Sequence, residues 1–253
     1  NVWNIGAEGQ YILGAIFASG VAMQASADSS RWIVVAILAA GMLGGMVWAG
    51  IVALLRDRFN ASEILVSRML VYVADMVLSY LVYGPWKDPK GYNFPQTINF
   101  LAVTKVPRLV DGLRANVGVL VALGAVLGTW ALLFRTYAGF QLQVGGLAPA
   151  AARYAGFSSR SALWLALMMS GGLAGLAGGL EAAGPLGQLT SNMPAGYGFA
   201  AIIVAFVGRL HPVGVVFSAI LMSMFYIGGE LAQSRMGLPK SITGVFQGLL
   251  LFS

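Results

Sequence analysis

Cysteine is absent from this chain, and histidine occurs only once, at position 211. Without cysteine there are no disulfides, thiolate metal sites or cysteine nucleophiles, and a single histidine disfavours a histidine metal centre or a Ser-His relay. Charge is scarce as well: Asp, Glu, Lys and Arg make up 9% of the 253 residues, whereas 58% are hydrophobic. Because a soluble domain needs a charged shell, this composition excludes soluble enzymes and indicates a membrane protein.

The net charge of +6 does not indicate a nucleic-acid partner. The basic residues lie singly or in pairs between apolar runs, as expected where loops meet anionic lipid. We therefore expect membrane lipid, and no nucleic acid, around this chain.

Apolar runs divide the chain into membrane-spanning helices, since about 20 helical residues cross about 30 Å of hydrocarbon. The candidate spans are Tyr11–Ala27, Trp32–Leu55, Ile64–Tyr83, Ala115–Phe134, Ser161–Ala183 and Val213–Ala232. The runs are apolar all round, which disfavours a β-barrel, and all nine prolines lie outside the clear spans. The pattern predicts an all-α polytopic membrane protein.

The run Tyr197–Val207 is apolar but too short to cross the bilayer as a helix. Gly196 precedes it, and Gly208 and Pro212 follow it. We interpret it as a half-helix that enters the membrane and turns back. Such interrupted helices are tolerated where they are buried in protein or line a water-filled path.

Polar side chains adjoin or interrupt these runs at two places. Asn4, Glu8 and Gln10 directly precede the first run, and Asp75 lies near the middle of its span, seven residues after Arg68. Ionisable groups at membrane depth are functional candidates because they are costly there. The alternatives are a solvated helix start for Glu8 and a neutral or hydrogen-bonded side chain for Asp75.

The segment from Leu147 to Arg160 predicts a short helix outside the bilayer. Pro149 suits its first turn and Gly156 its C-terminal cap. A helix this short needs a docking surface to be stable, although the segment could also be a plain turn. Within the spans, glycines at four-residue intervals, such as Gly171, Gly175 and Gly41, Gly45, predict close helix packing.

Several motifs together resemble the membrane subunits of bacterial ATP-binding cassette (ABC) importers. They are NIGAEGQ, GPWKDPKGYNFPQT, GLAPAAARYAGF, GGLAGLAGGLE and GYGFAAIIVAFVGRLHPVG. The resemblance is collinear over essentially the whole chain and is strongest to the nucleoside and simple-sugar branch of the ribose and branched-chain amino acid permeases. The chain departs from the family at Ala148 and Ala150, where Asn and Glu are usual, and at Asp75, where no acid is usual.

The resemblance implies a helix bundle with broken and re-entrant helices, similar to the vitamin B12 importer class. Residues 1–253 would be one permease domain truncated at both ends, with an extracytoplasmic loop at 85–114 and a cytoplasmic loop carrying a coupling helix at 135–160. The expected translocation path contains Asn4, Glu8, Gln10, Asp75, Tyr197 and Phe199. The expected ATPase-coupling residues are Pro149, Ala151, Ala152, Arg153, Tyr154 and Gly156.

We therefore expect a multi-pass subunit of a bacterial inner-membrane importer, most consistent with a nucleoside as its solute. Its expected partners are a cytoplasmic ATPase, which would hold ATP and Mg²⁺, an extracytoplasmic solute-binding protein and a second, non-identical permease. No catalytic residue, metal or cofactor is expected on this chain. Alternative solutes are a simple sugar such as ribose or branched-chain amino acids, and an alternative class is an ion-coupled secondary transporter.

Overall fold

The computed structural model describes residues 2–26, 28–109, 115–237, 244–245 and 248–249. Within these ranges the chain is helical and contains no strand, which confirms the all-α prediction. The helices are α1 (Ala7–Met23), α2 (Ile33–Phe59), α3 (Glu63–Tyr83), η1 (Ala102–Thr104), α4 (Gly118–Arg135), α5 (Tyr137–Leu147), α6 (Pro149–Tyr154), α7 (Ser159–Glu181), the π-helical turn η2 (Ala182–Leu186), α8 (Tyr197–Val207) and α9 (Pro212–Met236). Part of the expected long loop and most of the chain after Gly237 lie outside the described residues.

Five helices are long and apolar enough to cross a membrane: α2, α3, α4, α7 extended by η2, and α9. They coincide with five of the expected spans to within a few residues. The first expected span begins earlier than predicted, at Ala7, because the polar Glu8 and Gln10 are buried inside the bundle. Helix α5 was missed, since an 11-residue helix between Thr136 and Ala148 resembled a loop in sequence.

Helix α1 lies inside the bundle and packs against α2, α3 and α7. Its side chains Ile12, Ala15 and Ala18 are fully buried and form part of the main apolar core. Because α1 is enclosed by protein on several sides, its polar residues face other helices rather than lipid.

Glycine permits the close approach of α1, α2 and α7. A Cβ at Gly14 or at Gly45 would lie within 3 Å of the backbone of Gly175, and a Cβ at Gly175 would lie 2.3 Å from the carbonyl oxygen of Gly41. The predicted glycine-mediated packing is confirmed, and we call the contact among Gly14, Gly41, Gly45 and Gly175 the glycine crossing.

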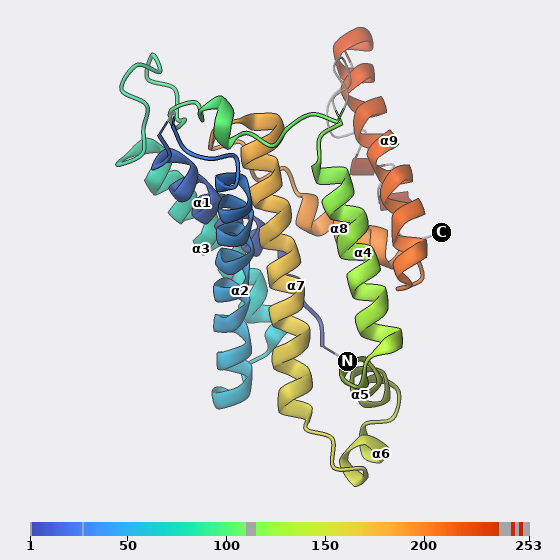
Figure 1. Cartoon of the computed structure of the whole chain (residues 1–253). Helices are drawn as coiled ribbons and strands as arrows, with labels where there is room; N and C mark the ends of the chain where they lie inside the picture. The colour runs from blue at the N-terminus through green and yellow to red at the C-terminus, as the bar shows by residue number, and fades with distance from the viewer. Residues whose placement is uncertain (1, 27, 110–114, 238–243, 246–247, 250–253) are drawn as a thin grey trace.

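The two ends of the bundle carry different structures (Figure 1). The long connection between α3 and α4 covers one end, whereas α5 and α6 project from the other. Helix α8 lies about half-way between the two ends and is followed by α9, which runs beside α4.

Candidate functional site

The carboxylate of Glu8 caps the start of α8. One oxygen, Oε1, accepts a hydrogen bond from the Gly196 backbone N–H at 2.9 Å, and Oε2 accepts one from the Gly198 N–H. Glu8 itself lies in the first turn of α1 and is 2% exposed. Two helix N-termini, each with partial positive charge, therefore meet at one buried carboxylate. The expectation of a solvated helix start at Glu8 is wrong.

The sequence explains why α8 can come so close to α1. A Cβ at Gly198 would lie 2.2 Å from the Glu8 backbone nitrogen, so this position admits only glycine. Gly196, the N-cap of α8, has a φ of 81°, a conformation that other residues rarely adopt. The GYG motif is thus required by the backbone geometry at the start of α8.

Asn4, Gln10 and Ser170 form a polar network next to this contact. The Asn4 amide donates to Gln10 Oε1 and to Ser170 Oγ, both at 2.8 Å, and its oxygen accepts from Gln10 Nε2 at 3.1 Å. The network joins the segment before α1 to α1 and α7. The structure thus brings three of the expected path residues, Asn4, Glu8 and Gln10, into one region.

Asp75 is not part of that region. It is exposed on α3, although Val71, Ala74 and Leu78 nearby on the same helix are buried, and it forms no hydrogen bond or ion pair with any described residue. Arg68 does not pair with it either. The Arg68 guanidinium carbon instead lies 4.7 Å from the centre of the Phe199 ring, which links α3 to α8.

Tyr197 belongs to a row of three tyrosine rings that the sequence did not reveal. Its ring centre lies 6.1 Å from that of Tyr11 on α1 and 5.5 Å from that of Tyr226 on α9, both in edge-to-face geometry. The three residues are up to 215 positions apart, since Tyr226 and Tyr11 come from opposite ends of the chain. No local motif could have grouped them.

The short helix α6 has the predicted ends. Pro149 occupies its first position, and Gly156, which follows it, has a φ of 78°. Ala152 is buried, whereas Ala151 and Arg153 are exposed and Tyr154 is 98% exposed. Phe157, just beyond α6, packs edge-to-face on two α5 rings, those of Tyr137 and Phe140. The helix is thereby anchored on one side and presents a bare surface on the other.

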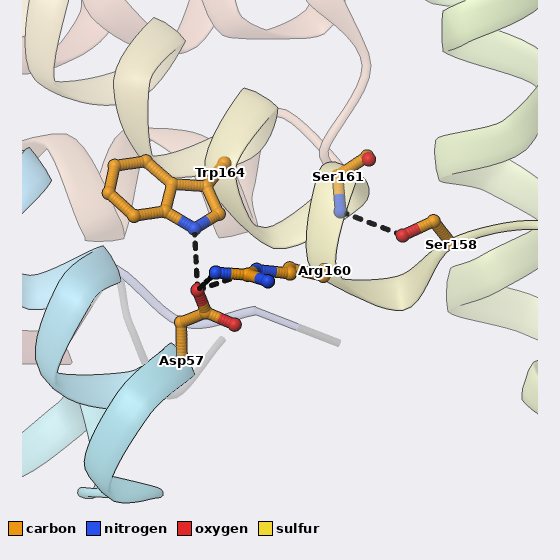
Figure 2. A network of polar contacts seen from close by, with 5 residues as sticks. All are labelled: Asp57, Ser158, Arg160, Ser161 and Trp164. Carbon is orange, nitrogen blue, oxygen red and sulfur yellow. Dashed lines mark hydrogen bonds and ion pairs between the residues drawn. The ribbon is translucent and has the colours of Figure 1, made fainter.

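A polar contact that the sequence did not predict joins α2 to α7 close to α6 (Figure 2). Asp57 Oδ2 accepts hydrogen bonds from Arg160 Nε at 2.7 Å and from Trp164 Nε1 at 3.2 Å, and Arg160 completes an ion pair with the same oxygen. The neighbouring Ser158 hydroxyl caps α7 by accepting from the Ser161 N–H. Figure 2 shows Arg160 and Trp164 converging on one carboxylate from successive turns of α7.

Among the described residues, no group of three or more His, Cys, Asp or Glu side chains gathers closely enough to hold a metal ion. His211 caps α9, because its Nδ1 accepts a hydrogen bond from the Val213 N–H at 3.3 Å. The polar groups of the bundle are arranged to connect helices to one another.

Comparison with known proteins identifies relatives along the whole chain. The glucose ABC transporter permease protein TsgB13 of Haloferax volcanii is 35% identical over 99% of this chain and 68% of its own length. Two guanosine ABC transporter permease proteins of Bacillus subtilis also match. NupP is 28% identical over 99% of this chain and 72% of its own length. NupQ is 27% identical over 97% of this chain and 78% of its own length. No solved structure matches the chain significantly.

The family model for the permease component of branched-chain amino acid transport systems matches residues 1–253. The apolar helices and these relatives agree on a multi-pass membrane protein that is a transporter component rather than an enzyme. The chain therefore belongs to the branched-chain amino acid transport system permease family, in the branch that contains nucleoside and sugar ABC permeases.

Proposed function

We propose that this chain is the membrane-spanning subunit of an ATP-driven importer that moves a nucleoside. The observation that carries the proposal is the collinear match to ABC permeases over 97–99% of the chain, two of which are guanosine permease proteins. Membership of this family implies a partner ATPase and a substrate-binding protein, and neither ATP nor Mg²⁺ would be held by this chain. A sugar is the second candidate solute because TsgB13, at 35% identity, is a glucose permease protein.

In this proposal α8 is a re-entrant half-helix beside the solute path, in an arrangement like that of the vitamin B12 importer class. Support comes from its length of 11 residues, its position half-way along the bundle and its capping by Glu8. Interrupted helices place backbone and polar groups where a membrane-spanning helix would present only apolar side chains. Asn4, Gln10, Tyr197 and Phe199 would then lie along the path, and Glu8 would hold α8 in place.

Coupling to the ATPase would run through α6. The exposed surface of α6 would dock on the ATPase, and α6 connects through four residues to the start of α7. The ion pair of Arg160 with Asp57 would pass movement of α7 to α2, and the glycine crossing would pass it to α1. Rigid helices that shift together in this way give two discrete states rather than a gradual deformation.

The proposal predicts that the exposed α6 side chains are required for transport. In liposomes that contain the assembled transporter, guanosine uptake should need ATP inside and the binding protein outside. Replacing Arg153 and Tyr154 together with alanine should lower ATPase co-purification and uptake by about tenfold or more, because exposed aromatic and arginine anchors dominate many interfaces. Subunit recovery and uptake of labelled guanosine are the measurements.

Lys90 and Tyr92 provide a matched control, since both are exposed on the loop at the opposite end of the bundle. Their double alanine variant should retain the ATPase. Normal co-purification and uptake in the α6 variant would contradict the coupling role. Uptake of glucose but not guanosine would assign the sugar, and uptake driven by a proton gradient without ATP would establish the secondary transporter.

Asp75 supports a second permease subunit as a partner. The residue lies mid-way along a membrane-spanning helix on a face that no described part of this chain covers. Because a carboxylate against lipid is costly, another protein or an aqueous path has to adjoin it. The presence of two guanosine permease proteins, NupP and NupQ, in one organism favours a non-identical partner.

We expect Asp75 to face an aqueous path between this chain and the second permease subunit in the assembled transporter. These 253 residues contain no cysteine, so Asp75→Cys introduces a single thiol among them. A water-soluble maleimide should label it at least about tenfold faster than Leu127→Cys, an exposed position within α4, because thiol reactivity needs the hydrated thiolate. Equal labelling rates at the two positions, measured by mass spectrometry, would show that Asp75 does not line an aqueous path.

A further inference from the structure

The three tyrosine rings described above lie near two carboxylates that form no ion pair with a described residue. Glu181 ends α7 three residues after Gly178, where a Cβ would lie 2.0 Å from the Tyr11 carbonyl oxygen, and Glu230 lies one turn after Tyr226 on α9. We refer to Tyr11, Tyr197, Tyr226, Glu181 and Glu230 as the tyrosine–glutamate cluster. Its members come from four helices, α1, α7, α8 and α9.

The polar atoms of this cluster lack partners within the described chain. The Tyr11 hydroxyl is buried and has no hydrogen-bond partner, and Tyr11 as a whole is 5% exposed. Neither Glu181 nor Glu230 forms an ion pair or a side-chain hydrogen bond with a described residue. Buried hydroxyl groups are nearly always hydrogen-bonded in folded proteins, so these groups have capacity for an external ligand.

The cluster is also reachable, which separates it from a sealed core. Tyr197 is 41% exposed, Glu230 is exposed, and Tyr226 and Glu181 are half-buried. By contrast, both oxygens of Glu8 accept hydrogen bonds from the Gly196 and Gly198 N–H groups, and the residue is only 2% exposed. Among the acids near α8, Glu181 and Glu230 are therefore the ones available to a solute.

We propose that the tyrosine–glutamate cluster is the solute-contact site of this permease and that it recognises an uncharged nucleoside. This inference rests on the proposed function and names the residues that carry it out. The accessible rings of Tyr197 and Tyr226 would stack on the flat base, since ring stacking needs no particular base edge. The Glu181 carboxylate would accept hydrogen bonds from the two ribose hydroxyls, for which its pair of oxygens is suited.

The negative charge of the two glutamates further restricts the class of solute that the cluster can bind. Two carboxylates that form no ion pair with a described residue repel a phosphate, so the site disfavours nucleotides. An uncharged solute with several hydroxyl or amino donors would satisfy both carboxylates. The three rings favour a nucleoside over a sugar, because a sugar lacks a large flat face.

The cluster is placed where ATP-driven movement would reach it. Helix α7 begins next to α6 and ends at Glu181, about 34 Å away at 1.5 Å per residue over its 23 residues. Tyr197 is carried by α8, which is held to α1 by Glu8. A shift of α7 relative to α8 would therefore separate Glu181 from Tyr197 and release the solute.

Guanosine uptake into liposomes by the complete transporter tests this assignment. Glu181→Gln keeps the shape of the side chain but removes its charge. It should lower the initial uptake rate at sub-saturating guanosine about tenfold, because one charge-assisted hydrogen bond to the solute is lost. Tyr197→Leu should lower it by a similar factor, whereas Tyr197→Phe keeps the ring and should retain most of the uptake.

Two controls isolate the effect. Tyr80→Leu removes a tyrosine that is 71% exposed on α3, and Asp28→Asn neutralises an exposed acid in the loop after α1; both should leave uptake unchanged. ATPase co-purification confirms that each variant assembles. Wild-type transporter that moves no guanosine would overturn the proposed function, whereas wild-type uptake that Glu181→Gln and Tyr197→Leu leave within twofold would overturn the site assignment alone.

Discussion

Replacing Gly175 with alanine should destabilise the protein strongly, although alanine favours a helix elsewhere. The new Cβ would lie 2.3 Å from the Gly41 carbonyl oxygen and 2.8 Å from the Gly45 Cα, and these are backbone atoms that no rotamer change can move aside. Overpacking of this kind costs about 1–3 kcal/mol or more, because α2 and α7 must separate. We expect a lower unfolding temperature in detergent and a lower yield of folded protein.

Gly128 on α4 is the matched control. A Cβ at this position meets nothing within 4 Å, and the residue is exposed. Gly128→Ala should leave the unfolding temperature unchanged or raise it, since alanine gains about 0.5–1 kcal/mol over glycine in a helix. If the two variants unfolded at the same temperature, the close approach of α1, α2 and α7 at the glycine crossing would be wrong.

Replacing Glu8 with alanine should have an effect of similar size. The Gly196 and Gly198 N–H groups would lose their acceptor next to a fully enclosed part of α1, and each unsatisfied buried donor costs about 1–3 kcal/mol. Glu8→Gln should be intermediate, because its amide retains one acceptor oxygen. The unfolding temperature and the guanosine uptake rate should fall together in the order wild type, Gln, Ala.

Glu63→Gln is the corresponding control for loss of an acid. Glu63 pairs with Arg56 at 3.2 Å at the partly exposed junction of α2 and α3, where ion pairs contribute about 0–1 kcal/mol. The unfolding temperature of the Glu63→Gln variant should differ little from that of the wild type. A Glu8→Ala protein that melts like the wild type but no longer transports would contradict the capping role and place Glu8 in direct contact with the solute.

The helices themselves follow closely from local sequence. A run of about 20 apolar residues can satisfy its backbone in a membrane only as a helix, so α2, α3, α4, α7 and α9 were predictable from composition and spacing. The ends of α6 were equally predictable, because Pro149 and Gly156 act through their own backbone conformations. The missed α5 shows the limit of this reasoning: it is short and lies within the stretch 135–160 that was interpreted as a loop.

The site was predictable only in part. Asn4, Glu8 and Gln10 stood out because polar side chains next to an apolar run are conspicuous in a chain with so few of them. Their partners did not stand out: Ser170 and Gly196 lie more than 160 positions further along the chain. Likewise, Asp57 gave no signal of its contact with Arg160, because a surface-type acid beside two arginines is common at the end of a membrane helix.

Sequence alone determined that this protein is an all-α membrane protein, where its spans lie and which family it resembles, since these depend on the chemistry of contiguous residues. Tertiary structure decided what each scarce polar residue does. It directed Glu8 to the start of α8, left Asp75 on an uncovered face and gathered Tyr11, Tyr197 and Glu181 from three helices. The physical reason is that the free energy of a polar group in a membrane depends on the groups that surround it, and packing brings those together from distant parts of the chain.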